Sequence, residues 1–196
     1  MSNPIQVAGA WRLGWALDLH TTSSVLIGYD ANGREQFDTK RSPLGELVYQ
    51  LKYKGQSQAA DQIATAMAGF FADKSTLLAQ IGLVVPMPAS THRAVQPVTT
   101  IASKLAQLLH KPFSDAAIQK IKATPMLKGI TDIAQRREVL DGAFAGDSTH
   151  LKNKGVLLVD DLYRSGSTAN AVTLALIAAG ATPVYFMAAT KTRSNV

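Results

Sequence analysis

Short apolar runs alternate with amphipathic stretches along most of the chain, an order typical of α/β folds. Apolar residues follow one another without alternation at 81–85, 156–159 and 183–189, as in strands buried on both faces. Helical spacing of apolar residues predicts helices over 43–54, 59–71, 94–109 and 168–179. A shorter strand is expected at 116–121 and a short helix near 131–137. We therefore expect a parallel sheet flanked by helices and built from right-handed βαβ units.

The first forty residues show a different pattern. Polar and apolar residues alternate loosely from Trp11 to Phe37, and Asn32-Gly33 is a favoured hairpin turn because both residues tolerate positive φ. This predicts a small antiparallel meander over residues 1–42, acting as a hood or flap. The remainder, 43–196, is expected to be one α/β domain, since no repeat or linker divides it.

Composition limits the chemistry that the chain can perform. Its 196 residues are 46% hydrophobic, which suffices for one sizeable core. The absence of Cys excludes disulfides, thiol nucleophiles and thiolate zinc sites, and the four His show no metal-ligand spacing. The net charge of +6 favours anionic ligands, although an ordinary basic surface explains it equally. Without a signal-like start or about 18 consecutive apolar residues, the protein is expected to be cytoplasmic, with no membrane partner.

A phosphate-binding pattern lies in residues 156–168, where a buried strand is followed by two acids, a small polar loop and a helix. In open α/β sheets, ligands bind beyond the carboxyl ends of strands, and a helix N-terminus offers free N–H groups to phosphate. The hydroxyls of Ser165, Ser167 and Thr168 add donors, and Gly166 lets the backbone approach the phosphate oxygens. The alternative is that the hydroxyls only cap the helix.

The two acids, Asp160 and Asp161, would repel that phosphate and therefore need donors or a cation at some distance. Ribose hydroxyls are such donors. Mg²⁺ bridging the hydroxyls and a pyrophosphate would also be favoured, because Mg²⁺ takes many of its ligands from substrate and water. The alternative is that the acids only end the strand.

These thirteen residues resemble the phosphoribosyl-pyrophosphate signature of type I phosphoribosyltransferases. In that family the acids bind the ribose hydroxyls and the loop binds the 5-phosphate, roles that the resemblance assigns here to Asp160, Asp161, Ser165, Gly166, Ser167 and Thr168. Leu162, Tyr163 and Arg164 lie in the same stretch and are also expected at the substrate, although Tyr163 and Arg164 replace the usual aliphatic and small residues. The resemblance implies a type I phosphoribosyltransferase-like fold. It also implies Mg²⁺ as cofactor, acting through the substrate, and phosphoribosyl pyrophosphate or a ribose 5-phosphate nucleotide as ligand.

Other segments resemble landmarks of the ComF-type branch of these proteins: 51–55, 84–88 and the region 120–144, which ends in 136–144, within a match over about 44–190. Two features depart from that branch. Its N-terminal cysteine zinc module is absent, and Ala94-Val95-Gln96 stands where a run similar to Arg-Gly-Phe-Asn is usual.

The resemblance also implies substrate contacts outside the signature. Met87, Ser90 and Arg93 occupy the place of the pyrophosphate loop, and Lys128 lies in the place of the mobile flap. Lys52 is implied to face an anion. Ordinary alternatives exist: Ser90 as a helix cap, Lys128 in a solvated loop, and Lys52 as a cation favoured in the last turn of its helix.

The leading hypothesis is phosphoribosyl transfer, in which a nitrogenous base attacks C1 of the ribose while Mg²⁺-pyrophosphate leaves. Such a reaction depends on positioning and charge stabilisation more than on a strong protein base. One alternative is a ComF-like, non-catalytic protein that binds single-stranded DNA during DNA uptake. Another is a regulatory sensor that binds phosphoribosyl pyrophosphate or a nucleotide without turnover. A homodimer is a further candidate assembly.

Overall fold

The computed structural model describes residues 4–89, 96–125, 130 and 132–193. Its centre is a five-stranded sheet in the order β1-β2-β9-β8-β5. Four of these strands are parallel neighbours: β2 (Leu13–Leu19), β9 (Val184–Lys191), β8 (Val156–Tyr163) and β5 (Leu83–Pro86). Only the edge strand β1 (Ile5–Gln6) runs antiparallel. The predicted fold class, a mainly parallel sheet flanked by helices, is confirmed.

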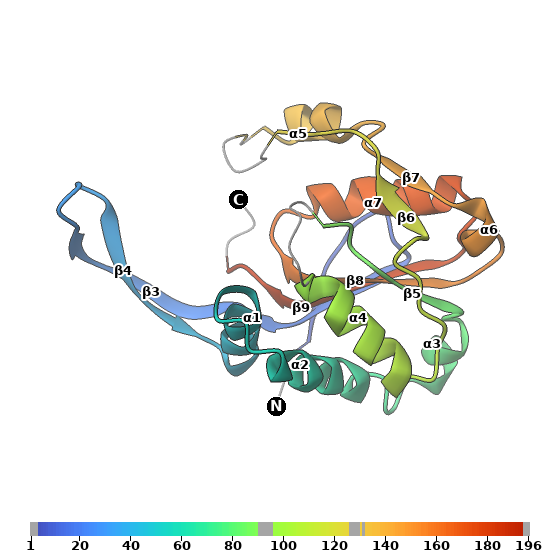
Figure 1. Cartoon of the computed structure of the whole chain (residues 1–196), viewed down its shortest axis with the longest axis horizontal. Helices are drawn as coiled ribbons and strands as arrows, with labels where there is room; N and C mark the ends of the chain where they lie inside the picture. The colour runs from blue at the N-terminus through green and yellow to red at the C-terminus, as the bar shows by residue number, and fades with distance from the viewer. Residues whose placement is uncertain (1–3, 90–95, 126–129, 131, 194–196) are drawn as a thin grey trace.

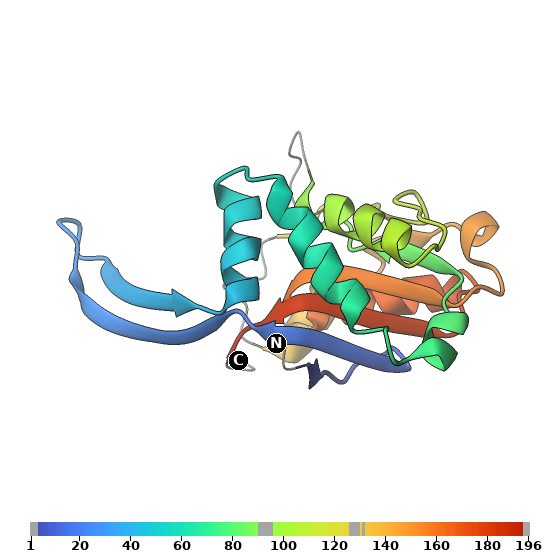
Figure 2. The ribbon, with the colours of Figure 1, turned by 90° about the horizontal axis from the view of Figure 1, so that it is seen from below.

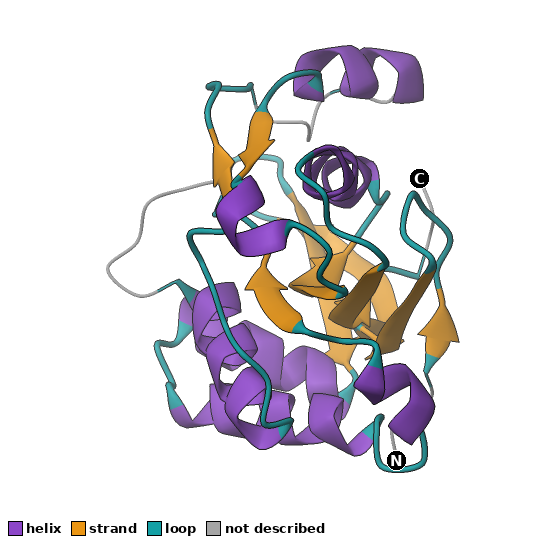
Figure 3. Cartoon of the chain, turned by 90° about the vertical axis from the view of Figure 1, so that its right-hand side faces the viewer, coloured by secondary structure: helices purple, strands orange, loops and turns teal. Residues whose placement is uncertain are grey.

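Helices cover both faces of this sheet (Figures 1 and 3). On one side lie α1 (Pro43–Tyr53), α2 (Gln58–Gly69), α3 (Ser75–Ala79) and α4 (Pro97–Leu108). On the other lie α7 (Ser167–Ala178), α5 (Ile133–Leu140), α6 (Ser148–Leu151) and the short strand pair β6 (Ile118–Lys120) and β7 (Phe144–Gly146). None of the helices described is both long and apolar enough to span a bilayer.

The inner strand β8 contributes to both layers because successive side chains in a strand point to opposite faces. Leu157 and Val159 pack among the core residues of α1, α2 and α4. Val156 and Leu158 pack with those of α7. All four are fully buried. The same alternation decides where the two acids that follow will point.

The N-terminal segment differs from the expected meander. Leu13–Leu19 joins the central sheet as β2, parallel to β9, because its apolar residues are needed to fill the core. The hairpin is confirmed: β3 (Thr21–Tyr29) and β4 (Glu35–Arg41) pair antiparallel, and Gly33 in the connecting turn has a φ of 74°. However, the hairpin does not form a hood over the sheet, since it projects from the body as a long arm (Figures 1 and 2).

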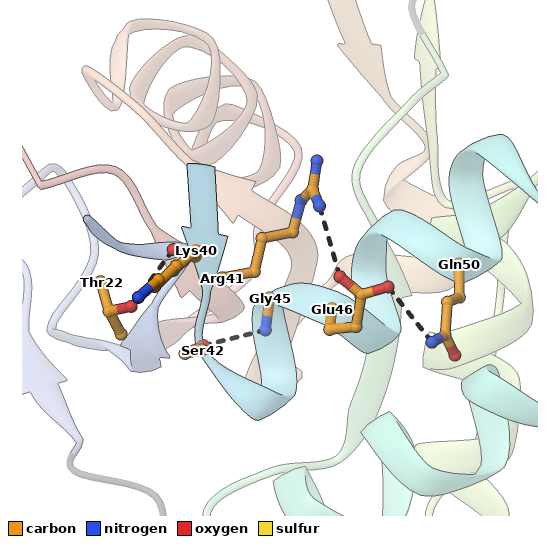
Figure 4. Close-up of polar contacts among 7 residues, drawn as sticks. All are labelled: Thr22, Lys40, Arg41, Ser42, Gly45, Glu46 and Gln50. Atoms are coloured by element: carbon orange, nitrogen blue, oxygen red, sulfur yellow. Dashed lines mark hydrogen bonds and ion pairs between the residues drawn. The ribbon is translucent and has the colours of Figure 1, made fainter. Parts of the chain in front are cut away.

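The base of this arm is fastened to α1 (Figure 4). The hydroxyl of Ser42 donates to the carbonyl of the last residue of β2 at 2.5 Å and accepts from the N–H of Gly45 at 2.9 Å. Arg41 forms a 3.3 Å ion pair with Glu46, and its guanidinium lies 3.7 Å from the ring centroid of Tyr49. The end of the arm and the first turns of α1 therefore form one joint.

Candidate functional site

The pocket lined by the predicted loop lies where β8 extends beyond the end of its neighbour β5. The last residue of β5, Pro86, pairs with Val159, whereas β8 continues to Tyr163 alongside β9 alone. At this carboxyl end of the sheet lies a pocket of about 200 Å³, lined by residues Leu162 to Ala169 together with Arg136 and Asp160. The structure thus brings every predicted residue from Leu162 to Thr168 to one pocket.

The loop between β8 and α7 leaves the start of the helix accessible. Gly166 occupies the cap position with a φ of 75°, in the left-handed region that glycine adopts without steric cost. Gly166 has no side chain to cap α7, the N–H of Ser167 makes only a long 3.5 Å hydrogen bond to the hydroxyl of Ser165, and the first turn contains no acid. The hydroxyl oxygens of Ser165 and Ser167 lie 3.1 Å apart at the pocket wall. This arrangement offers backbone N–H groups, hydroxyls and the positive end of the helix dipole to an anion.

The two acids point to opposite faces of β8. Asp160 has the parity of Leu158, so it faces α7 and lines the pocket. Asp161 has the parity of Val159 and faces α1, where it is only 4% exposed. The sequence placed both acids at an open strand end, but strand alternation buries one of them inside the protein.

Asp161 is held by Lys52, whose ammonium nitrogen lies 2.8 Å from each carboxylate oxygen. Its backbone carbonyl accepts a 3.2 Å hydrogen bond from Thr190, and the hydroxyl of Thr190 lies 3.1 Å from Nδ1 of His20. Burial, followed by the charges of Arg41 and Lys52, lowers the pKa of His20. Lys52 was predicted to contact substrate, and in the structure it forms this ion pair, which joins α1 to β8.

Asp160 has a different electrostatic setting. Burial, and then the neighbouring charge of Asp161, raise the pKa of Asp160 to about 7. The N–H of Asp161 donates to its Oδ1 at 2.8 Å and partly offsets this. Donors or a cation entering the pocket would therefore favour the ionised carboxylate. No cluster of three or more potential metal ligands occurs among the described residues, so a metal here would share one carboxylate with substrate and water, as Mg²⁺ commonly does.

The remaining predicted residues have separate outcomes. The side chain of Met87 is buried in the core, and its N–H donates to the carbonyl of Val159 at 2.8 Å, so Met87 extends the sheet and does not present its side chain to a ligand. Ser90, Arg93 and Lys128 lie outside the described residues.

Tyr163, one of the departures from the signature, packs against the loop at Gly166. Its ring packs against Trp11 and Phe186, with ring centroids 6.3 and 5.8 Å away. A Cβ at Gly166 would lie 2.7 Å from the hydroxyl oxygen of Tyr163. Glycine is therefore needed for its φ and for this close approach, whereas Arg164 is exposed at the rim.

Arg136 also borders the pocket, and from the sequence alone it is compatible with either a phosphate clamp or a solvated charge. It lines the pocket, and its Nε donates to the carbonyl of Ile130 at 2.6 Å. Together with Ser165 and Ser167 it also borders a larger, mainly apolar groove of about 840 Å³ between α5 and α7. Its place depends on how α5 packs over α7, which no local pattern reveals.

No protein-family model and no curated protein matches the chain in sequence. Among solved structures, the chain is similar to the allosteric regulatory enzyme of purine biosynthesis, with 16% identity over 82% of this chain and 34% of that one, at a TM-score of 0.49. It is similar to glutamine phosphoribosylpyrophosphate amidotransferase from B. subtilis, with 15% identity, the same two coverages and the same TM-score. It is also similar to adenine phosphoribosyltransferase from Thermoanaerobacter pseudethanolicus, with 14% identity over 86% of this chain and 94% of that one, at a TM-score of 0.46. The chain spans about a third of the length of the first two enzymes.

Proposed function

We propose that the protein binds phosphoribosyl pyrophosphate with Mg²⁺ and transfers the phosphoribosyl group to a nitrogenous base, releasing pyrophosphate. The observation that carries this proposal is the meeting, in one pocket, of the weakly capped start of α7 and the carboxyl group of Asp160. The helix start suits a phosphomonoester, and an acid beyond it suits the hydroxyl groups of a sugar. A site for phosphate alone would gain nothing from that carboxylate.

In this proposal the loop from Ser165 to Thr168 holds the 5-phosphate, and Asp160 accepts hydrogen bonds from the ribose hydroxyls. Asp161, fixed by Lys52, keeps the end of β8 in place and adds negative charge behind Asp160. Those two charges would stabilise positive charge that develops on the ribose as the bond to pyrophosphate breaks. Mg²⁺, when bound with the substrate, would neutralise the departing pyrophosphate. In this proposal the protein positions the substrate and stabilises the developing charges electrostatically, and no strong base is required.

A thermal-shift experiment with Mg²⁺ and four ligands tests the binding step. We expect stabilisation by phosphoribosyl pyrophosphate and ribose 5-phosphate, and less by glucose 6-phosphate, which shares the phosphate but not the ribose. A ligand at 100 times its dissociation constant adds about 2.7 kcal/mol to the free energy of unfolding. Pyrophosphate is the fourth ligand, because it reports the leaving-group subsite by itself. Asp160→Asn should remove the preference for ribose phosphates.

Turnover is tested separately by measuring pyrophosphate release with a panel of purine and pyrimidine bases. Release that depends on one class of base supports transfer, and loss of release in Asp160→Asn assigns it to this pocket. Saturable ligand binding without pyrophosphate release for any base would indicate a sensor in place of an enzyme. If ribose phosphates do not stabilise the protein, whereas single-stranded DNA binds with a steep salt dependence, the ComF-like DNA-binding alternative takes its place.

A further inference from the structure

The arm formed by β3 and β4 exposes an unusual amount of apolar side chain. Five large residues, Val25, Leu26, Ile27, Tyr29 and Phe37, are 43–65% exposed. Leu26 lies opposite Phe37 on one face of the ribbon, and strand alternation places Val25 on the other, while Ile27 is the extra residue of a register irregularity between Leu26 and Gly28. An isolated two-stranded ribbon is only marginally stable in water. An arm that is apolar on both faces is therefore expected to be covered by another molecule.

The charge of the arm limits what that molecule is. Within a chain of net charge +6, residues 21–41 contain three acids and three bases and so carry no net charge. Nucleic acids and anionic membranes select basic segments, since much of their affinity comes from neutralising phosphates. The neutral, apolar arm favours a protein surface.

The two edges of the arm differ sharply in protection. Natural sheets block pairing at their edges with charged residues, and β4 carries four: Glu35, Asp38, Lys40 and Arg41. In contrast, β3 has neither a charged residue nor a proline from Thr21 to Tyr29, and its regular pairing is interrupted only between Thr21 and Ser23 and between Leu26 and Gly28. Within the described part of the chain, each strand pairs only with the other. Arg193 donates to the carbonyl of Thr22 at 2.6 Å near the base, which leaves the edge beyond it, from Ser24 to Tyr29, accessible.

We propose that two copies of this chain associate by antiparallel pairing of their β3 edges about a twofold axis. Such pairing sets a strand against its own copy, so a charge near the axis meets a like charge, which is destabilising. Asp38 stands in the middle of β4 and would face this repulsion. β3 contains no charge, and its β-branched Val25 would form a favourable cross-strand pair.

The geometry of the arm suits this role. It projects away from the body (Figures 1 and 2), so that two bodies, each with a net charge of +6, need not approach closely. The joint between Arg41, Ser42 and α1 (Figure 4) fixes the base of the arm. An arm with a fixed base loses less conformational freedom on pairing than a flexible one.

Sedimentation velocity over a dilution series tests the proposal with two matched variants. Ile27→Lys places a charge on β3, and Gln36→Lys places the same charge on β4, at nearly the same distance along the arm. We expect the unaltered protein and Gln36→Lys to reach a particle of twice the 20.9 kDa chain mass. Ile27→Lys should weaken self-association at least ~tenfold, because its Lys blocks the edge and repels its copy. Circular dichroism confirms that both variants are folded.

A crosslinking experiment gives a second measurement, because the protein has no Cys of its own. Leu26→Cys and Phe37→Cys replace cross-strand neighbours on the same face, one near each edge. Under mild oxidation, Leu26→Cys should form a disulfide-linked dimer much faster than Phe37→Cys. A chain that stays monomeric throughout the dilution series, or self-association that Ile27→Lys leaves unchanged, overturns the proposal. So does a monomer that binds lipid vesicles through the arm, since that outcome assigns the apolar residues to a membrane.

Discussion

Helices α1 and α7 both begin at the carboxyl end of the parallel strands, α1 beside the last residue of β2 and α7 after β8. The groups that cap their first turns differ. At α1, Ser42 caps the N–H of Gly45, Pro43 occupies a position where no N–H is needed, and Glu46 places an acid in the first turn (Figure 4). At α7, Gly166 at the cap position has no side chain, the N–H of Ser167 makes only a long 3.5 Å hydrogen bond to the hydroxyl of Ser165, and the first turn contains no acid. The first turn of α1 is thus capped by close side-chain contacts, whereas the first turn of α7 is capped weakly.

The same contrast continues on the two faces of β8. Toward α1, the charge of Asp161 is matched by Lys52 at 2.8 Å. Toward α7, Asp160 lines the pocket, and burial followed by the charge of Asp161 raises its pKa to about 7, so its ionised form is less favoured than that of an exposed carboxyl group. Structural joints and binding sites thus use the same residue types. They differ in whether another residue of the protein supplies the opposite charge or the hydrogen-bond partner.

The largest expected effect concerns pH and Asp160. Between its ordinary pKa of 3.8 and its folded pKa of about 7, the folded state binds more protons than the unfolded state, so stability falls as the pH rises through this range. One pKa unit corresponds to about 1.4 kcal/mol, which makes the full loss up to about 4 kcal/mol. Asp160→Asn should remove this loss, and urea unfolding of both proteins from pH 4 to pH 8 measures it. Parallel stability curves for the two proteins would show that Asp160 ionises normally, and that the pocket does not need a ligand donor.

The next effect tests the α1 side. Lys52→Met keeps the length of the side chain but leaves the buried Asp161 without its ammonium partner, which should cost about 2–3 kcal/mol of unfolding free energy. Adding Asp161→Asn should recover part of that loss. Lys104→Met is the control, because it breaks an ion pair with Asp61 that is more exposed and is expected to cost at most ~1 kcal/mol. Equal losses of unfolding free energy in Lys52→Met and Lys104→Met would show that the Lys52–Asp161 pair contributes no more than a surface ion pair.

The third variant gives α7 the acid that α1 possesses. Thr168→Glu puts a carboxylate at the second position of α7, inside the pocket, and should weaken phosphoribosyl pyrophosphate binding at least ~100-fold, or about 2.7 kcal/mol. The helix itself should gain about 0.3–1 kcal/mol, since an acid is favourable in a first turn. Thr76→Glu makes the same change at the same position of α3, outside the pocket, and should leave binding unaltered. Isothermal titration and thermal unfolding separate the two effects, and unchanged affinity in Thr168→Glu would place the phosphate elsewhere.

The sequence predicts the sheet, its helices and the phosphate loop because each depends on local rules: apolar periodicity, a Pro or Gly at an end, and hydroxyls before a helix. The φ of 75° at Gly166 also follows from such a rule. The side chain of Met87, a residue predicted at the substrate, is buried because the preceding apolar run continues into the core for one residue more than its Pro suggests.

The surroundings of Asp161 could not be predicted in this way. His20, Lys52 and Thr190 come from three distant segments, and only the packing of α1 against the sheet brings them together. The opposite orientations of the two acids were accessible in principle, since strand alternation requires them once β8 is extended past Val159. The projecting arm was not, because a hairpin pattern gives no information on whether the hairpin folds back onto the body.

The smallest effect isolates the contact beneath the phosphate loop. Gly166 and Gly55 have similar φ values of 75° and 66°, but a Cβ at Gly166 would meet the ring and hydroxyl of Tyr163 at 2.7–3.1 Å, whereas a Cβ at Gly55 would meet nothing within 4 Å. Alanine at either position carries the backbone strain of a left-handed residue, on the order of 1 kcal/mol. Gly166→Ala should therefore cost about 0.5–1 kcal/mol more than Gly55→Ala in chemical unfolding, because the close-packed ring must move. Tyr163→Phe removes the nearest atom, and in that background the excess should shrink. Equal costs for the two alanines would mean that Tyr163 yields freely, and that backbone conformation alone demands glycine at the start of α7.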